Sequence, residues 1–177
     1  MRFSLKLLFI LAMAAGSVTA MPPLAAQETG FDEARVVSAI GDAQLRAVIT
    51  RIGATITPLD EEKNALRIGY TNGARGIARR MACPPDIAPG EPCKGLLLIG
   101  YFAKPEGVDD ARAMAAAMQF NREQNLASVA VSQRGEHVVK TYVIFDGGIT
   151  LGNVAVQVAL FGESVAAYQT LLFGGEN

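Results

Sequence analysis

The segment Leu96–Phe102 most constrains the fold that this chain can adopt. It is a continuous apolar run interrupted only by Gly100, and it follows a proline-rich loop. A short apolar run of this kind, bounded by turn residues, is typical of a central strand that is covered on both faces. The rest of the chain therefore has to supply neighbouring strands and the layers that cover them.

Several short β-type runs flank this central segment. Ala54–Leu59, Ala65–Tyr70 and Gly76–Ala82 precede it, and Leu126–Val131 and His137–Phe145 follow it. The dipeptide Asn72-Gly73, between two of these runs, is a strong signal for a tight hairpin. These segments predict an antiparallel sheet of about five to six strands.

Apolar periodicity predicts helices before and after the strands. A short helix begins at Asp42, which we expect as its N-cap, and stops at Gly53. Residues 21–41 are expected to form an N-terminal linker with a short helix. At the other end, Thr150 can cap a long helix whose apolar residues recur at alternating steps of three and four.

A further helix is predicted between the strands, from Asp109 or Asp110 to about Gln124. Met114 and Met118 lie one turn apart on it, and we expect them to fill the core. With its two to three helices packed on an antiparallel sheet, the chain is predicted to have an α+β fold.

The N-terminus has the residue order of a secretory signal. Arg2 and Lys6 precede the apolar run Leu7–Ala15, and small residues follow. This order predicts a signal peptide over residues 1–20, with cleavage after residue 20 or as late as residue 26. An uncleaved membrane anchor is the alternative, but Pro22-Pro23 argues against it. We expect a periplasmic or secreted protein with no stable membrane anchor after cleavage.

The two cysteines, Cys83 and Cys93, enclose the proline-rich loop. In an exported protein, a small even number of cysteines favours a disulfide. A zinc site needs about four Cys or His ligands, and the one histidine, His137, lies far along the chain. A catalytic redox pair usually has the C-x-x-C spacing. We predict a structural disulfide that contributes roughly 2.5–3 kcal/mol.

The charge balance gives no footprint for nucleic acid. The formal net charge is −1, and it becomes −3 when the two cations of the signal peptide are removed. Nucleic-acid binding requires a clustered basic face. Arg75, Arg79 and Arg80 cluster in the sequence with Lys94, and a solvated strand face explains them.

No catalytic constellation is recognisable in the sequence. His137 has no G-x-S-x-G motif to accompany it, and the glycines at 69, 73 and 76 are not followed by the Gly-Lys-Ser/Thr of a phosphate loop. The paired acids Asp109-Asp110 and Glu61-Glu62 fit a helix start and a turn. We therefore predict a protein that is not an enzyme and has no cofactor and no metal.

Several motifs, taken in order, resemble the YbjN family of bacterial sensory-transduction regulators. They are Cys83 at a strand end, Phe120-Asn121-Arg122 at a helix end and Asp146-Gly147-Gly148 before the last helix. The resemblance spans residues 42–173, which we expect to form a YbjN-like domain. It implies a fold similar to that of type III secretion chaperones, which is often dimeric. Phe120, Asn121 and Arg122 are candidate binding or family-motif residues.

Two functions are consistent with these observations. The first is an exported, non-catalytic binding or regulatory module that engages a polypeptide partner by strand addition or in an apolar groove. The second is a small-molecule or lipid-binding envelope protein that holds its ligand between the sheet and the long helix. A homodimer could bury Val156 and Leu160, which widen the apolar surface of that helix, although burial by the chain's own sheet is the simpler interpretation.

Overall fold

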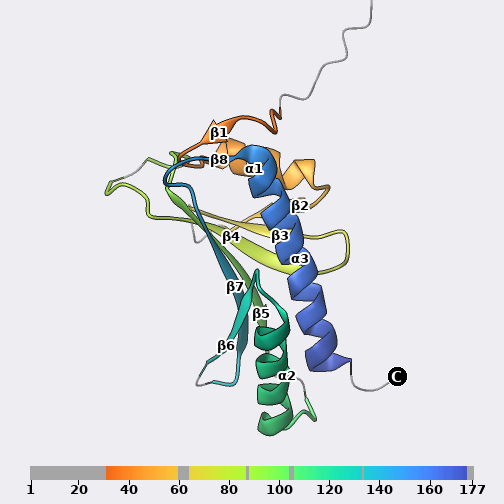
Figure 1. Cartoon of the computed structure of the whole chain (residues 1–177). Coiled ribbons are helices and arrows are strands. Elements are labelled where there is room, and N and C mark those ends of the chain that lie inside the picture. Colours follow the sequence, from red (N-terminus) through yellow and green to blue (C-terminus); the bar gives the residue numbers. More distant parts are fainter. Residues whose placement is uncertain (1–30, 60–63, 87, 104–105, 133, 175–177) are drawn as a thin grey trace, which may run out of the picture.

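The computed structural model describes residues 31–59, 64–86, 88–103, 106–132 and 134–174. Its elements, in chain order, are β1 (Val36–Val37), α1 (Asp42–Arg51), β2 (Thr55–Pro58), β3 (Ala65–Gly69), β4 (Arg75–Met81), β5 (Gly95–Phe102), α2 (Asp110–Glu123), β6 (Ser128–Val131), β7 (His137–Ile144), β8 (Ile149–Thr150) and α3 (Leu151–Phe173). The predicted α+β fold is confirmed, with a six-stranded antiparallel sheet and three helices among the described residues (Figure 1).

The main sheet has the strand order β2-β3-β4-β5-β7-β6, and each neighbouring pair is antiparallel. The apolar strand β5 is central, as predicted, and pairs with β4 on one side and β7 on the other. The predicted hairpin at Asn72-Gly73 joins β3 to β4, where Gly73 adopts a positive φ of 84°. A small second sheet pairs β1 with β8.

The three helices pack against one face of the main sheet, and α3 crosses it (Figure 1). The side chains of Phe161, Val165 and Tyr168 are buried between α3 and the sheet. The helix lies close to the strands because glycines face it. A Cβ atom built on Gly100 would lie 3.1 Å from the Val165 side chain, and one on Gly76 would lie 3.4 Å from the ring of Phe161.

The predicted cap of α3 is confirmed, the predicted start of α2 is correct, and the predicted cap of α1 is wrong. Thr150 caps α3 by accepting a hydrogen bond from the Asn153 backbone N–H, and Asp109 caps α2 in the same way. The prediction for α1 was wrong by one residue, because Gly41 is the N-cap and Asp42 is the first helical residue. The Gln44 side chain accepts a hydrogen bond from the Gly41 N–H, so an uncharged capping arrangement replaces the expected carboxylate.

The described part of the N-terminal segment contains no helix. Residues 31–41 form a turn and the strand β1 rather than a short helix. The β-branched pair Val36-Val37 pairs with Ile149-Thr150, which favours an extended backbone there. The predicted signal peptide over residues 1–20 and the rest of the linker up to residue 30 lie outside the described residues. Among the described helices, none combines the length and apolarity needed to cross a bilayer.

The prediction that β5 is covered on both faces was wrong. Leu96 and Leu98 point toward the helices and are fully buried. Leu97, Ile99 and Tyr101 alternate with them and point to the opposite face, where the structure places no helix (Figure 1). Among the described residues, the apolar run is therefore covered by helices on one face only.

Candidate functional site

The face of the main sheet that is turned away from the helices is the candidate site, and we call it the helix-free face. Three of its large apolar side chains are substantially exposed: Tyr101 is 56% exposed, Tyr142 45% and Ile144 63%. The side chains that form it are Thr55, Thr57, Arg67, Arg75, Ile77, Arg79, Leu97, Ile99, Tyr101, Val138, Lys140, Tyr142 and Ile144. Several large exposed apolar side chains on one face of a sheet are characteristic of an interaction site.

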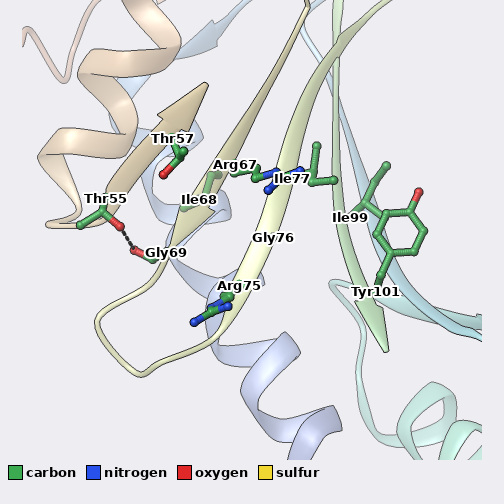
Figure 2. A pocket seen from close by; sticks show the side chains of 10 residues that line it. All are labelled: Thr55, Thr57, Arg67, Ile68, Gly69, Arg75, Gly76, Ile77, Ile99 and Tyr101. Carbon is green, nitrogen blue, oxygen red and sulfur yellow. Dashed lines mark hydrogen bonds between the residues drawn. The ribbon is translucent and has the colours of Figure 1, made fainter. Parts of the chain in front are cut away.

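A shallow hollow of about 460 Å³ lies on this face over β2, β3, β4 and β5 (Figure 2). Its floor is apolar, from Ile77 and Ile99, and its rim carries hydroxyl and guanidinium groups. Figure 2 shows the side chain of Arg67 reaching across β4 toward Ile77, with Tyr101 on the far side of Ile99. The hollow can therefore hold a side chain that is apolar at one end and a hydrogen-bond acceptor at the other.

The charged side chains of the strands are all positive. None of the strands β1 to β8 contains Asp or Glu, whereas the main sheet contains several arginines and one lysine. On the helix-free face, Arg67, Arg75 and Lys140 are exposed, and none of them forms an ion pair with another described residue. This face is consequently positive although the whole chain has a formal net charge of −1.

The two edges of the sheet are poorly suited to strand addition. Strand β2 spans only Thr55–Pro58, and proline cannot donate a ladder hydrogen bond. On the other edge, the Asn121 side chain accepts a hydrogen bond from the Val129 N–H at 2.6 Å and donates one to the Val129 carbonyl at 2.9 Å. Asn121 therefore occupies the backbone groups of Val129 on the outer edge of β6, which an added strand would otherwise use.

The three candidate motif residues of α2 have different environments. Phe120 is fully buried, and its ring makes an edge-on contact with the ring of Tyr168, 5.2 Å between centroids. Asn121 binds the edge of β6, and Arg122 is exposed in the last turn of the helix. The structure does not bring these residues together into one site, and none of them is part of the helix-free face.

Comparison with known proteins identifies part of the chain. A family model described as "Putative bacterial sensory transduction regulator", the YbjN family, matches residues 87–173. Residues 87–173 are a YbjN-family region. The family resemblance seen in the sequence is thus confirmed over this range.

Two solved structures are similar to the chain. One is the crystal structure of YbjN from E. coli, "a putative transcription regulator", which aligns with a TM-score of 0.54 and 14% identity over 73% of this chain and 86% of that one. The other is the HopA1-SchA chaperone-effector complex, at a TM-score of 0.47 and 11% identity over 72% of this chain and 91% of that one. The likeness to YbjN shows the fold. No curated protein matches the sequence.

The YbjN region covers only part of the helix-free face. Tyr101, Lys140 and Tyr142 lie inside the matched range, whereas Arg67 and Arg75 precede it. The region contains α2 and α3, so it also contains Asn121 and its contact with β6. The cationic half of the hollow is therefore contributed by the part of the chain that the family model does not match.

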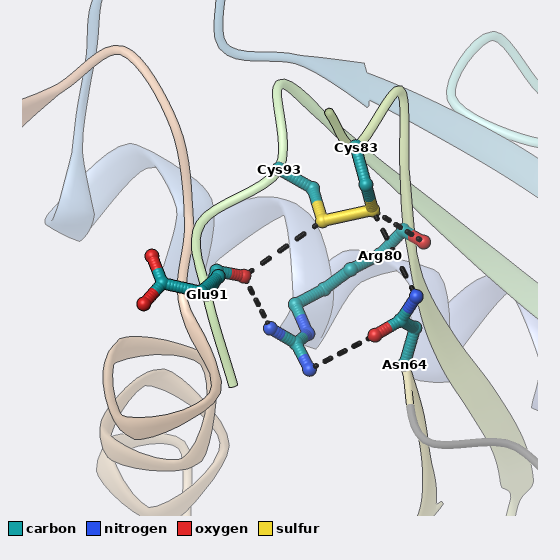
Figure 3. The surroundings of a disulfide bond; sticks show 5 residues. All are labelled: Asn64, Arg80, Cys83, Glu91 and Cys93. Carbon is teal, nitrogen blue, oxygen red and sulfur yellow. Dashed lines mark hydrogen bonds between the residues drawn. A yellow bond between two sulfur atoms is a disulfide. The ribbon is translucent and has the colours of Figure 1, made fainter. Parts of the chain in front are cut away.

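Cys83 and Cys93 are joined by a disulfide, and their loop connects β4 to β5 (Figure 3). Arg80 lies beneath this loop and is only 3% exposed, donating a hydrogen bond to the Glu91 carbonyl at 2.7 Å. Burial lowers the pKa of its guanidinium. The expected solvated arginine cluster is therefore divided, because strand alternation turns Arg80 to the face opposite Arg75 and Arg79.

His137 is buried in the core, where its Nδ1 is hydrogen-bonded to the hydroxyl of Tyr168. Burial lowers the pKa of His137 and raises that of Tyr168 to about 12. Neutral imidazole and neutral phenol are therefore the stable forms at neutral pH, which fits the structural role expected for this histidine. The described residues contain no group of three or more His, Cys, Asp or Glu side chains arranged for a metal ion.

The prediction that Met114 and Met118 fill the core was wrong. They are 47% and 65% exposed, and α2 instead buries Ala113, Ala117 and Phe120. Small alanine side chains let α2 approach the sheet closely, so that Phe120 can reach Tyr168. The methionines are left on the outer surface of the helix.

Proposed function

We propose that this chain is an exported, non-catalytic binding or regulatory module that engages a polypeptide partner on its helix-free face. The observation that carries the proposal is the exposure of Tyr101, Tyr142 and Ile144 on a sheet face that no described helix covers. Burying such side chains against a partner stabilises the complex through the hydrophobic effect, and aromatic residues are enriched at binding surfaces.

The regulator description of the YbjN family agrees with a module that acts by binding. The geometry favours the face of the sheet over its edges, because Asn121 covers part of β6 and Pro58 ends β2. The phenol of Tyr142 lies over Gly95, where any side chain would collide with it. A partner therefore meets a comparatively flat aromatic surface next to the hollow, which suits an extended polypeptide.

Export is part of the proposal. The signal-like order of residues 1–20 supports it, and the Cys83–Cys93 disulfide is typical of proteins that fold in an oxidising compartment. Expression of the full chain in a Gram-negative host should give a periplasmic protein that lacks residues 1–20 or 1–26, as measured by intact mass. A full-length product in the cytoplasm would contradict export and leave the binding face unaffected.

The alternative function placed a small molecule or lipid between the sheet and the long helix. That space is filled by Phe161, Val165 and Tyr168, each at most 1% exposed, and Gly100 brings α3 within contact distance of β5. No observation in the described structure favours this second function, so the polypeptide-binding module is the better-supported proposal.

Site-specific photocrosslinking tests the proposed face. A benzophenone amino acid replaces Tyr101 on the helix-free face, and a matched variant carries it at Met118, which is similarly exposed but lies on α2. In cells that produce the tagged full chain, we expect a polypeptide adduct from position 101 and none from position 118. Equal adducts at both positions, or none at position 101, would refute the proposed face.

A further inference from the structure

One row of side chains crosses the helix-free face from strand to strand. Arg67 is opposite Ile77, Ile77 is opposite Ile99, and Ile99 is opposite Lys140. Residues directly opposite one another in antiparallel strands point to the same face. The row therefore presents a cation, two isoleucines and a second cation, in that order, over β3, β4, β5 and β7.

The spacing of this row matches an extended peptide. Neighbouring strands lie about 4.8 Å apart, so the backbone positions of Arg67 and Lys140, three strand spacings apart, are separated by about 14 Å. An extended segment advances about 3.3 Å per residue, so its residues i and i+4 are about 13 Å apart on one side. Residue i+2 then lies above the pair formed by Ile77 and Ile99.

Among the described residues, neither end of the row has an opposite charge beside it. Arg67 and Lys140 are exposed and form no ion pair with a described residue, and the strands around them contain no carboxylate. Ile99 between them is only 3% exposed and forms part of the floor of the hollow. The apolar centre of the row is thus recessed between two cations, which suits the entry of one apolar side chain with an acidic side chain on either side of it.

We propose that the partner segment is acidic and carries the pattern acid–x–apolar–x–acid, lying across strands β3 to β7. This inference rests on the proposed function and specifies the chemistry of the partner. The first acidic side chain pairs with Arg67, the apolar one contacts Ile77 and Ile99, and the second acidic one pairs with Lys140.

Fluorescence anisotropy with short dye-labelled peptides tests the pattern on the mature, oxidised protein. The probe peptide has Glu-Ser-Leu-Ser-Glu at its centre, and its comparators have Gln-Ser-Leu-Ser-Gln and Lys-Ser-Leu-Ser-Lys. The protein variants are Arg67→Glu/Lys140→Glu and the matched control Arg112→Glu/Arg122→Glu, which reverses two exposed cations of α2 outside the face.

We expect the Glu peptide to bind the unaltered protein more tightly than the Gln peptide, by up to about fivefold for each exposed ion pair, and less so at high salt. The variant Arg67→Glu/Lys140→Glu should reverse the preference and favour the Lys peptide. The control Arg112→Glu/Arg122→Glu should keep the original order.

Three outcomes would overturn the inference. If the Glu and Gln peptides bind equally and Tyr101→Ser weakens both, the face binds polypeptides but does not select acidic ones. If vesicles of phosphatidylglycerol bind through Arg67 and Lys140 whereas no peptide binds, the partner is a lipid surface. If neither peptides nor vesicles bind, the inference and the proposed face are both wrong.

Discussion

Replacing Asn121 by Ala should destabilise the protein through the edge of the sheet. The substitution removes two hydrogen bonds, from the Val129 N–H at 2.6 Å and to the Val129 carbonyl at 2.9 Å. At about 0.5–1.5 kcal/mol for each, the loss is about 1–3 kcal/mol. Alanine recovers roughly 0.6 kcal/mol through its higher helix propensity in α2. The free energy of unfolding should therefore fall by about 0.4–2.4 kcal/mol, which lowers Tm by several degrees.

Urea unfolding followed by circular dichroism measures the total effect, and amide hydrogen exchange locates it. Exchange of the Val129 N–H should accelerate more than that of β5, because β6 loses its outer partner whereas the centre of the sheet is unchanged. Asn125→Ala is the matched control, since Asn125 is exposed and has no partner among the described residues. Equal stability losses in the two variants, or an unchanged Val129 exchange rate, would refute the assigned role of Asn121.

Two further predictions concern the disulfide and the buried histidine. Cys83→Ser/Cys93→Ser should lower the free energy of unfolding by about 2.5–3 kcal/mol, from the entropy of a loop with a sequence separation of 10. Reductant should shift the urea-unfolding midpoint of the unaltered protein to that of the variant. If the variant unfolds at the same urea concentration as the oxidised protein, the disulfide does not contribute to stability. Because burial lowers the pKa of His137, the unfolded chain binds its proton more readily, and stability should decrease as pH falls below about 6.5 until the folded-state pKa is reached. The free energy of unfolding, measured by urea titration at each pH, should change by at most about 1.4 kcal/mol per pH unit. If the His137→Gln variant shows the same pH dependence, His137 is not its cause.

Local signals in the sequence predicted much of the fold correctly. The start of α2 at Asp109 or Asp110, the cap at Thr150 and the turn at Asn72-Gly73 depend on neighbouring backbone groups, so a few residues determine them. The central position of β5 in the sheet was also predicted, because a short apolar run favours a strand with a neighbouring strand at each edge. Contacts between residues far apart in the sequence could not be predicted from such local signals. The choice between Met118 and Phe120 as the buried residue of α2 depends on a sheet that lies elsewhere in the chain.

The helix-free face could not be predicted from the apolar run alone. A strand covered by helices on both faces and a strand that keeps one face for a partner both need apolar side chains on each face. Ile99 and Tyr101 therefore look like core residues in the sequence, although Tyr101 is 56% exposed. The cations that complete the site, such as Arg67, lie in another strand and look like ordinary solvated residues. Only the strand register brings them together.

The charge of the helix-free face also bears on self-association. Two copies that met through this face would bring Arg67, Arg75 and Lys140 of one copy toward the same cations of the other, with no strand carboxylate to compensate. A homodimer is therefore expected to form elsewhere, and the outer side of α3 is the apolar alternative, with Val156 56% and Leu160 41% exposed. Because that surface and the helix-free face lie on opposite sides of the sheet, a dimer built through α3 would leave both copies free to bind a polypeptide.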